Sequence, residues 1–340
     1  MPAVLVHTAA QAPAMSRSSS SSTITLVSTP HLKSFEPFEP EVTCTTLTAA
    51  AINKPLKAAF SSAVAELESP LRIVGLLATP DSGCRMYADM TARACASSGV
   101  TFHLQHATHS FDAVAETIHA LNNDDGVDGL IVYFPLFEPD QDAILRSLIS
   151  PRIDVEGLSG LPPDPAPFGL QTAAYPCTAL AVVRALQHPT AALYDASRPA
   201  GSGFQGTITV VNRSPTVGQP LARMLAADGA RVFSVDINGA QMLHLLNGEI
   251  AISSLDAAME DMLGQSDAVV SAVPGNFCLD TASFKPGCVA IDLSEHGNFG
   301  ANVRERARVF APRIGGVTIL MLQINALVLR RQSQPASKLK

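Results

Sequence analysis

Apolar residues recur along this chain in two alternating patterns. Short runs of aliphatic and β-branched residues are typical of strands buried on both faces, and longer stretches with apolar residues three or four apart are typical of helices. In the first half, the patterns predict strands at residues 71–77, 102–105 and 129–134, and helices at 46–67, 82–98, 111–121 and 140–148. This alternation indicates an α/β layer built on a parallel sheet.

The second half repeats the alternation after a region rich in proline and glycine at residues 159–175. We expect strands at 208–211, 231–235, 268–272 and 288–293, helices at 178–186, 217–225 and 318–331, and a loop at 189–206. The helix at 178–186 is placed to bridge two domains, and the helix at 318–331 to pack back on the first. The pattern therefore predicts a chain of two α/β domains.

Residues 207–238 have the order strand, turn, helix, strand and acidic residue that is typical of a dinucleotide-binding βαβ unit. Of the usual glycines only Gly218 remains, but Ser214 can offer a hydroxyl and Arg213 a charged pair of N–H donors to a pyrophosphate. Asp236 ends the second strand, where a carboxylate accepts hydrogen bonds from both ribose hydroxyls of NAD and repels the 2′-phosphate of NADP. The alternative is a buried βαβ unit without a ligand.

Composition narrows the class of protein. At 340 residues with 47% hydrophobic and 16% charged residues, the chain has room for two domains with ample cores, and no apolar run approaches a membrane span. The net charge of −7 disfavours nucleic acid as a partner. Six widely spaced cysteines without C-x-x-C spacing favour reduced thiols over a zinc site or disulfides. We predict no metal site.

The first 35 residues contain no acidic residue and include a run of serines at 18–22. Such a composition is one mark of an organellar transit peptide, but the usual series of arginines on an amphipathic helix is missing. We expect a disordered tail or an over-extended gene start. The predicted location is cytoplasmic, with a mitochondrial location left open.

Several motifs occur in the order in which one enzyme family carries them. They are S-x-x-x-x-Y at 82–87, GLIVYFPLF at 129–137, DVEGL at 154–158, YPCT at 175–178, NRSPTVGQP at 212–220, KPG at 285–287 and IGGVT at 314–318. On these motifs the chain resembles the methylenetetrahydrofolate dehydrogenase/cyclohydrolase family over residues 45–332. The resemblance implies two α/β domains with a cleft between them. It places a poorly ordered tail at 1–43, a folate-binding catalytic domain at 44–176 plus 316–333, a Rossmann-type parallel-sheet NAD domain at 177–315, and a tail at 334–340.

Three residues depart together from the pattern of the bifunctional members. Thr91 stands where they carry the lysine that follows the motif tyrosine, Tyr133 replaces a glutamine, and Glu156 replaces an aspartate. In the family those three residues work together in the cyclohydrolase site. The chain therefore resembles the fungal-type monofunctional, NAD-dependent branch. That branch implies oxidation of 5,10-methylenetetrahydrofolate to 5,10-methenyltetrahydrofolate with NAD, without cyclohydrolase activity.

The chemistry of the two reactions supports this branch. Hydride transfer from the bridging carbon needs no general base, only close alignment of donor and acceptor. Hydrolysis of the methenyl product needs an activated water and a protonated nitrogen, and a lysine-to-threonine replacement removes the obvious group for that work. A chain can thus lose hydrolysis and keep hydride transfer.

The resemblance also implies roles for individual residues. The catalytic residues that it implies are Cys177 and Tyr87. The residues that it places at the folate are Tyr133, Asp154, Glu156, Gly315, Gly316 and Thr318. The residues that it places at NAD are Arg213, Ser214, Asp236, Ile237, Val273, Pro274, Leu293 and Ser294. Cys177 follows a proline at a helix start, where a thiolate is stabilised, but a packing or substrate-orienting role is equally open. Either Asp154 or Glu156 could bind the pterin ring, unless both are loop carboxylates in solvent.

Two other functions stay open. A two-domain NAD(P) oxidoreductase of the shikimate dehydrogenase type would need a Lys/Asp pair, and the sequence offers no suitable one. A catalytically inactive folate- or dinucleotide-binding protein is motivated by the triple replacement at Thr91, Tyr133 and Glu156. The resemblance implies tetrahydrofolate derivatives as substrates and a homodimer.

Overall fold

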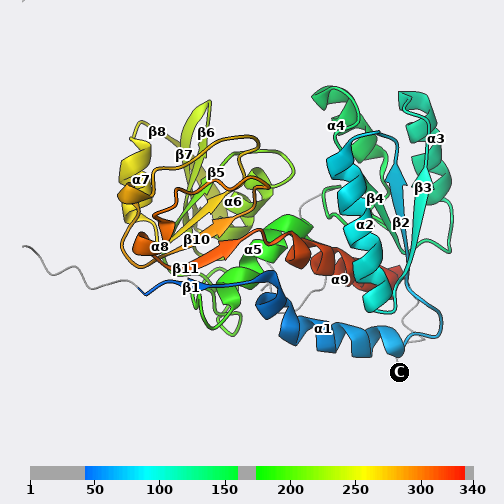
Figure 1. Cartoon of the computed structure of the whole chain (residues 1–340), viewed down its shortest axis with the longest axis horizontal. Coiled ribbons are helices and arrows are strands. Elements are labelled where there is room, and N and C mark those ends of the chain that lie inside the picture. Colours follow the sequence, from blue (N-terminus) through cyan, green and yellow to red (C-terminus); the bar gives the residue numbers. More distant parts are fainter. Residues whose placement is uncertain (1–42, 160–173, 334–340) are drawn as a thin grey trace, which may run out of the picture. The chain divides into compact units, whose positions relative to one another are not determined.

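The computed structural model describes residues 43–159 and 174–333, in which strands and helices alternate along most of the chain. The described strands form two sheets, one of three strands and one of eight (Figure 1). None of the described helices is both long and apolar enough to cross a membrane.

The three-stranded sheet has the order β3-β2-β4, and its strands are parallel. It consists of β2 (Arg72–Leu77), β3 (Thr101–His106) and β4 (Gly129–Val132), with helices α2 (Ser82–Ser97), α3 (Phe111–Asn122) and α4 (Pro139–Leu148). Side chains of β2 alternate between two apolar clusters: Ile73 packs in a cluster with residues of α2, and Val74 in one with residues of α3 and α4. Burial on both faces explains the unbroken apolar runs of these strands.

The eight-stranded sheet has the order β1-β11-β10-β9-β5-β6-β7-β8. Its strands are β1 (Thr45–Thr46), β5 (Thr207–Val211), β6 (Arg231–Asp236), β7 (Gly239–Leu246), β8 (Glu249–Leu255), β9 (Ala268–Ser271), β10 (Cys288–Asp292) and β11 (Ala307–Pro312). The connections are α6 (Gly218–Ala227), α7 (Met259–Gln265), a short 3₁₀ helix (Thr281–Ser283) and α8 (Val303–Arg306). Strand order reverses between β5 and β9, and such a switch point opens a crevice at the carboxyl ends of parallel strands.

Three further helices connect the two sheets through contacts: α1 (Ala49–Ala65), α5 (Cys177–Gln187) and α9 (Gly315–Ser333). Helix α9 contacts α1, α2 and α5, and α5 also contacts α6. One continuous apolar cluster therefore includes Ile73 of the small sheet, Leu180 of α5, Leu322 of α9 and Val210 of the large sheet.

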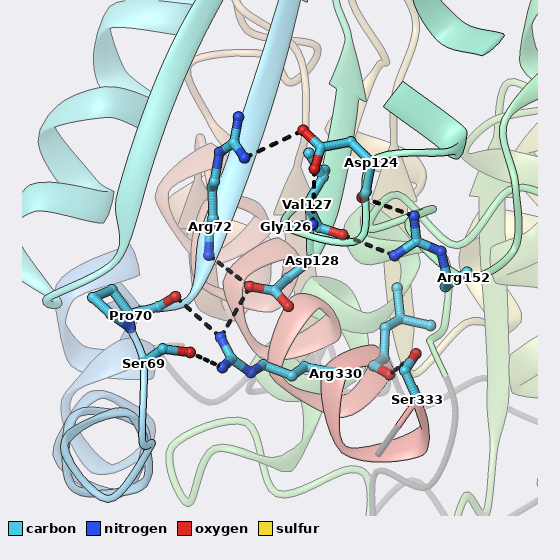
Figure 2. A network of polar contacts seen from close by, with 11 residues as sticks. Ser69, Pro70, Arg72, Asp124, Gly126, Val127, Asp128, Arg152, Arg330 and Ser333 are labelled. Carbon is cyan, nitrogen blue, oxygen red and sulfur yellow. Dashed lines mark hydrogen bonds and ion pairs between the residues drawn. The ribbon is translucent and has the colours of Figure 1, made fainter. Parts of the chain in front are cut away.

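A polar network fixes the carboxyl-terminal end of α9 (Figure 2). The Arg330 guanidinium donates to the Pro70 carbonyl oxygen at 3.0 Å, to the Asp128 carboxylate at 3.1 Å and to the Ser69 hydroxyl. The same Asp128 oxygen accepts the backbone N–H of Arg72 at 2.8 Å. This network ties the helix to the beginning of β2 and to the turn before β4.

The strands and helices predicted from periodicity are confirmed, with ends that differ by a few residues. The last helix begins at Gly315 rather than at residue 318. The hairpin β7–β8 was not anticipated, although its turn, Asn247-Gly248, is a strong hairpin signal because both residues adopt positive φ. The predicted loop at 159–175 lies largely outside the described residues, as do both predicted tails.

Candidate active site

A cavity of about 190 Å³ brings together predicted residues from four separate segments. Tyr87 comes from α2, Tyr133 follows β4, Glu156 ends the turns at 151–156, and Cys177 begins α5. The turn after β5 adds Thr216 and Val217, and the remaining lining residues are Ile131, Val132, Phe134, Arg146, Leu158 and Thr178. The cavity thus combines residues of the folate motifs with the predicted phosphate turn.

The two tyrosines form one wall of this cavity. Their ring centroids lie 6.1 Å apart in an edge-to-face arrangement. Tyr133 is buried, and its hydroxyl lies near the Thr91 side chain. Burial raises the pKa of both phenols above the ordinary value, so both hydroxyls keep their protons and can donate. A protonated phenol at a cavity wall can donate a hydrogen bond to a polar ligand atom.

Thr91 lies one helical turn beyond Tyr87 and is fully buried. Its hydroxyl donates to the Tyr87 carbonyl oxygen at 2.9 Å, within its own helix. Where bifunctional members carry a lysine, this chain therefore has a short side chain engaged with its own backbone. Among the described lining residues the basic side chain is Arg146, whose guanidinium lies over the Phe134 ring at 5.1 Å.

The two carboxylates of the DVEGL motif have different surroundings. Asp154 is buried and accepts the backbone N–H groups of the next loop residues, Glu156, Gly157, Leu158 and Ser159, at 2.6–3.1 Å. It does not line the cavity, whereas Glu156 does. Burial, and then the nearby Asp154 carboxylate, raise the pKa of Glu156 to about 8, against a smaller opposing effect of Arg146. The alternative of two solvent-exposed loop carboxylates is wrong.

Cys177 is the first residue of α5 and is buried at the cavity wall. Its backbone N–H donates to the Glu156 carbonyl oxygen at 3.1 Å. Burial, followed by the nearby Glu156, raises the pKa of this thiol well above its ordinary value. The prediction of a stabilised thiolate is therefore wrong: the helix start favours the anion only modestly, and loss of solvent outweighs it. This geometry fits a packing or orienting role.

All eight residues predicted at NAD lie at the carboxyl ends of β5, β6, β9 and β10, which parallel pairing brings to one edge of the sheet. Arg213 and Ser214 follow β5, Asp236 and Ile237 lie at and just after the end of β6, and the remaining four are Val273, Pro274, Leu293 and Ser294. Ile237 is 98% exposed, and the Asp236 carboxylate accepts its backbone N–H at 2.6 Å.

Arg213 does not extend freely from the phosphate turn. Its guanidinium donates to the Ser234 hydroxyl at 3.1 Å and to the Ser234 and Gly239 carbonyl oxygens at 2.8 Å each. These bonds hold the turn between β6 and β7, where Asp236 lies. In this conformation the Arg213 guanidinium binds the turn around Asp236, and its N–H donors are not directed at a pyrophosphate as the sequence predicted.

Gly218 is required where α6 starts against the phosphate turn. A Cβ atom at this position would lie 1.8 Å from the Asn212 carbonyl oxygen. Asn212 itself has φ of +86°, and its amide donates to the Ala272 carbonyl oxygen at 2.6 Å. The hydroxyl of Ser214 accepts the N–H groups of Val217 and Gly218 at 3.3 Å each. The surviving glycine thus permits close helix–strand packing.

Sequence patterns missed Asn298, which connects the loops after β9 and β10. Asn298 is fully buried. Its side-chain oxygen accepts hydrogen bonds from the Ser271 hydroxyl and the Val273 N–H, and its side-chain nitrogen donates to the Val273 and Phe277 carbonyl oxygens. Its backbone N–H donates to the Asp292 carboxylate. No local pattern marks it, because an asparagine in a loop gives no periodic signal.

The residues predicted at the folate from the last helix lie outside this cavity. Gly315 is exposed, Gly316 accepts the Asn53 amide at its carbonyl oxygen at 2.9 Å, and Thr318 is buried in the first turn of α9. None of the three lines the cavity with Tyr87 and Glu156.

Comparisons with known proteins agree with this geometry. Residues 46–156 match the family described as tetrahydrofolate dehydrogenase/cyclohydrolase, catalytic domain. The chain is 33% identical over 308 residues to the methylenetetrahydrofolate dehydrogenase [NAD(+)] of Schizosaccharomyces pombe, covering 85% of this chain and 94% of that protein. It is 35% identical over 282 residues to the enzyme of the same name from Saccharomyces cerevisiae, covering 78% and 87%. The solved NAD-dependent 5,10-methylenetetrahydrofolate dehydrogenase of S. cerevisiae superimposes with a TM-score of 0.76 at 30% identity, covering 86% of this chain and 99% of that one.

Proposed function

Because this chain belongs to the family of NAD-dependent methylenetetrahydrofolate dehydrogenases, we propose that it oxidises 5,10-methylenetetrahydrofolate to 5,10-methenyltetrahydrofolate by hydride transfer to NAD. The observation that carries the proposal is the cavity in which Tyr87, Tyr133, Glu156 and Cys177 meet the turn after β5. Residues of the folate motifs and of the predicted phosphate turn line this same cavity.

The residues at the sheet edge fit a dinucleotide. Gly218 allows α6 to begin directly against the turn, and Asp236 ends β6 beside the fully exposed Ile237, where an adenosine has room. When bound, NAD supplies C4 of its nicotinamide ring as the hydride acceptor. The Asp236 carboxylate would accept the ribose hydroxyls and repel a 2′-phosphate, which explains a preference for NAD.

The chain's task in this reaction is alignment. The C–H bond of the bridging carbon breaks with its electron pair, and the lone pair of the adjacent nitrogen forms the C=N bond of the cationic product, so no side chain has to remove a proton. Tyr87 and Tyr133 carry protonated hydroxyls that can donate to the substrate, and Glu156, which also lines the cavity, would face the pterin. Cys177, a neutral thiol at the cavity wall, would pack against the bound substrate. Such alignment can lower the barrier by about 7–11 kcal/mol.

Cyclohydrolase activity is absent from the proposed function. Hydrolysis needs a group that activates water and protonates nitrogen. Thr91 is buried and bonded to its own helix, and it offers no such group. Purified protein should leave the rate of methenyl hydrolysis at the rate of the buffer alone, and faster hydrolysis would contradict this part of the proposal.

We propose residues 44–176 plus 316–333 as the folate-binding domain and 177–315 as the NAD domain, although Thr45 and Thr46 pair with β11 in the large sheet.

We also propose a cytoplasmic homodimer that binds neither nucleic acid nor membranes. The net charge of −7 supports the first exclusion. The homodimer is supported by the edge strand β8, which exposes Ile252 and has no lysine or proline to block pairing with a second copy. Light scattering should therefore give twice the mass of one chain.

Absorbance at 340 nm tests the activity directly. Protein, 5,10-methylenetetrahydrofolate and NAD should produce reduced nicotinamide, with much slower production from NADP. No reduced nicotinamide with either cofactor would favour the inactive binding protein, and activity only with a hydroxy acid such as shikimate would favour the other oxidoreductase class.

A further inference from the structure

Asn325 lies in the middle of α9 and is fully buried. The side chains around it on this helix are mostly aliphatic. Its amide nitrogen donates to the Val155 carbonyl oxygen at 2.8 Å and to the Tyr175 carbonyl oxygen at 2.8 Å. A buried amide is costly unless it is hydrogen-bonded, so these two bonds indicate a specific use.

The two carbonyl groups belong to the loops that bring Glu156 and Cys177 to the cavity. Val155 directly precedes Glu156, and Tyr175 is two residues before Cys177. The loops also touch each other: the Cys177 N–H donates to the Glu156 carbonyl oxygen at 3.1 Å. Asn325 therefore joins two cavity-forming loops through a helix that is remote from both in sequence.

The two loops pack closely against each other where Gly157 meets Tyr175. Gly157 has φ of +69°, and a Cβ atom there would lie 2.3 Å from the Tyr175 carbonyl carbon. The Asp154 carboxylate fixes the first loop from inside through four backbone N–H groups. Asn325 adds a bond from outside the loop, because its amide donates to the Val155 carbonyl oxygen.

We propose that Asn325 is a positioning residue for the substrate site, holding the Glu156 loop and the Cys177 loop at the separation at which both side chains line the cavity. The assignment of this cavity to folate rests on the proposed function. Asn325 does not line the cavity, so it acts through the two loops. An asparagine meets the requirement because one amide group carries two N–H donors, one for each carbonyl oxygen, whereas an aspartate carries none when ionised and a leucine none at all.

The first experiment measures loop position without relying on activity. Asn325→Leu and, as a matched control, Gln323→Leu are labelled with iodoacetamide, and alkylation of Cys177 is followed by peptide mass spectrometry. Gln323 is buried on the same helix, but its amide donates to the Ile319 carbonyl oxygen of that helix at 3.3 Å. We expect Cys177 to react about tenfold faster in Asn325→Leu, because the freed loop opens locally, and at the wild-type rate in Gln323→Leu. Equal rates in wild type and Asn325→Leu would overturn the proposal.

The second experiment separates positioning from general destabilisation. In Asn325→Leu we expect the KM for 5,10-methylenetetrahydrofolate to rise about tenfold while the KM for NAD stays near the wild-type value. Equal increases in both, or the same pattern in Gln323→Leu, would show a merely structural role. Asn325→Asp, which has the same size, is measured in the same way and decides the question if Asn325→Leu does not fold. A wild-type protein without dehydrogenase activity would refute the proposed function, yet the labelling result would still decide whether Asn325 holds the loops.

Discussion

At the scale of single residues, burial changes the titration of the Glu156 carboxyl. Its pKa is raised from 4.5 to about 8 by burial and by Asp154. Below pH 4.5 the carboxyl is protonated in both folded and unfolded chains; between 4.5 and 8 only the unfolded chain ionises. The folded state therefore loses stability as pH rises through this window, and the loss is complete above pH 8.

Glu156→Gln should remove this loss. Each pKa unit corresponds to about 1.4 kcal/mol, and because the side chain is only partly buried we expect a gain of about 2 kcal/mol at pH 9. Near pH 4 the variant and the wild type should be about equally stable. Urea unfolding of both proteins at the two pH values measures the difference. A difference that does not depend on pH would show that the carboxyl titrates normally.

Asp236 governs cofactor choice at the same scale. Its carboxylate ends β6, and the bonds of Arg213 to Ser234 and Gly239 hold the turn around it. Asp236→Ser removes the negative charge that repels a 2′-phosphate. We expect the ratio of kcat/KM for NADP to that for NAD to rise at least about tenfold, since two like charges about 4 Å apart repel by about 1 kcal/mol in water and about 4 kcal/mol near a protein surface. An unchanged ratio would place the adenosine ribose elsewhere.

At the scale of elements, the last helix depends on its anchored end. The Arg330 and Asp128 side chains are only 13% and 14% exposed, whereas the comparable pair Arg72–Asp124 is 40% and 41% exposed. Removing one partner of a buried pair leaves a buried charge, so Arg330→Met should cost about 3 kcal/mol of the free energy of unfolding. Arg72→Met, which leaves an exposed aspartate, should cost under about 1 kcal/mol. Urea denaturation compares the two variants.

Arg72 begins β2, and Arg330 of α9 bonds to Pro70 and Asp128 beside it, whereas Tyr133 of the cavity follows the carboxyl end of the parallel strand β4. In folded protein neither substitution should change the KM for folate. Equal costs for the two arginines would mean that solvent reaches the Arg330 pair as readily as the surface pair, and that the network of Figure 2 contributes little to stability.

Elements and site residues differ in how far the sequence predicts them. Strands such as β2 and β5 are visible because burial on both faces leaves an unbroken apolar run, a local property. Local motifs are enough to propose Glu156 and Cys177 as site residues. They do not predict that the two residues share a cavity or that the pKa of the thiol is raised, because both properties depend on burial by distant segments. Asn325 was invisible for the same reason: it bonds to residues 170 and 150 positions away.

At the scale of the whole molecule, the two sheets share one apolar core. Leu180 of α5 and Leu322 of α9 belong to the same cluster as Ile131 of the small sheet and Ile208 of the large one. The described residues of both sheets also group as one compact unit. A core that is continuous through two helices couples the sheets energetically, since neither can lose its partner helices without exposing apolar surface.

We therefore expect residues of both sheets to unfold in one transition. In calorimetry the protein should give a single peak whose calorimetric and van't Hoff enthalpies agree. Ile131→Ala in the small sheet and Ile208→Ala in the large sheet, each removing a buried side chain and costing about 3 kcal/mol, should each lower the midpoint of that single transition. If the sheets were independent, the two substitutions would instead shift two different peaks, each leaving the other in place. The chain contains no tryptophan, so circular dichroism at 222 nm and tyrosine fluorescence serve as the two probes, and their transitions should coincide.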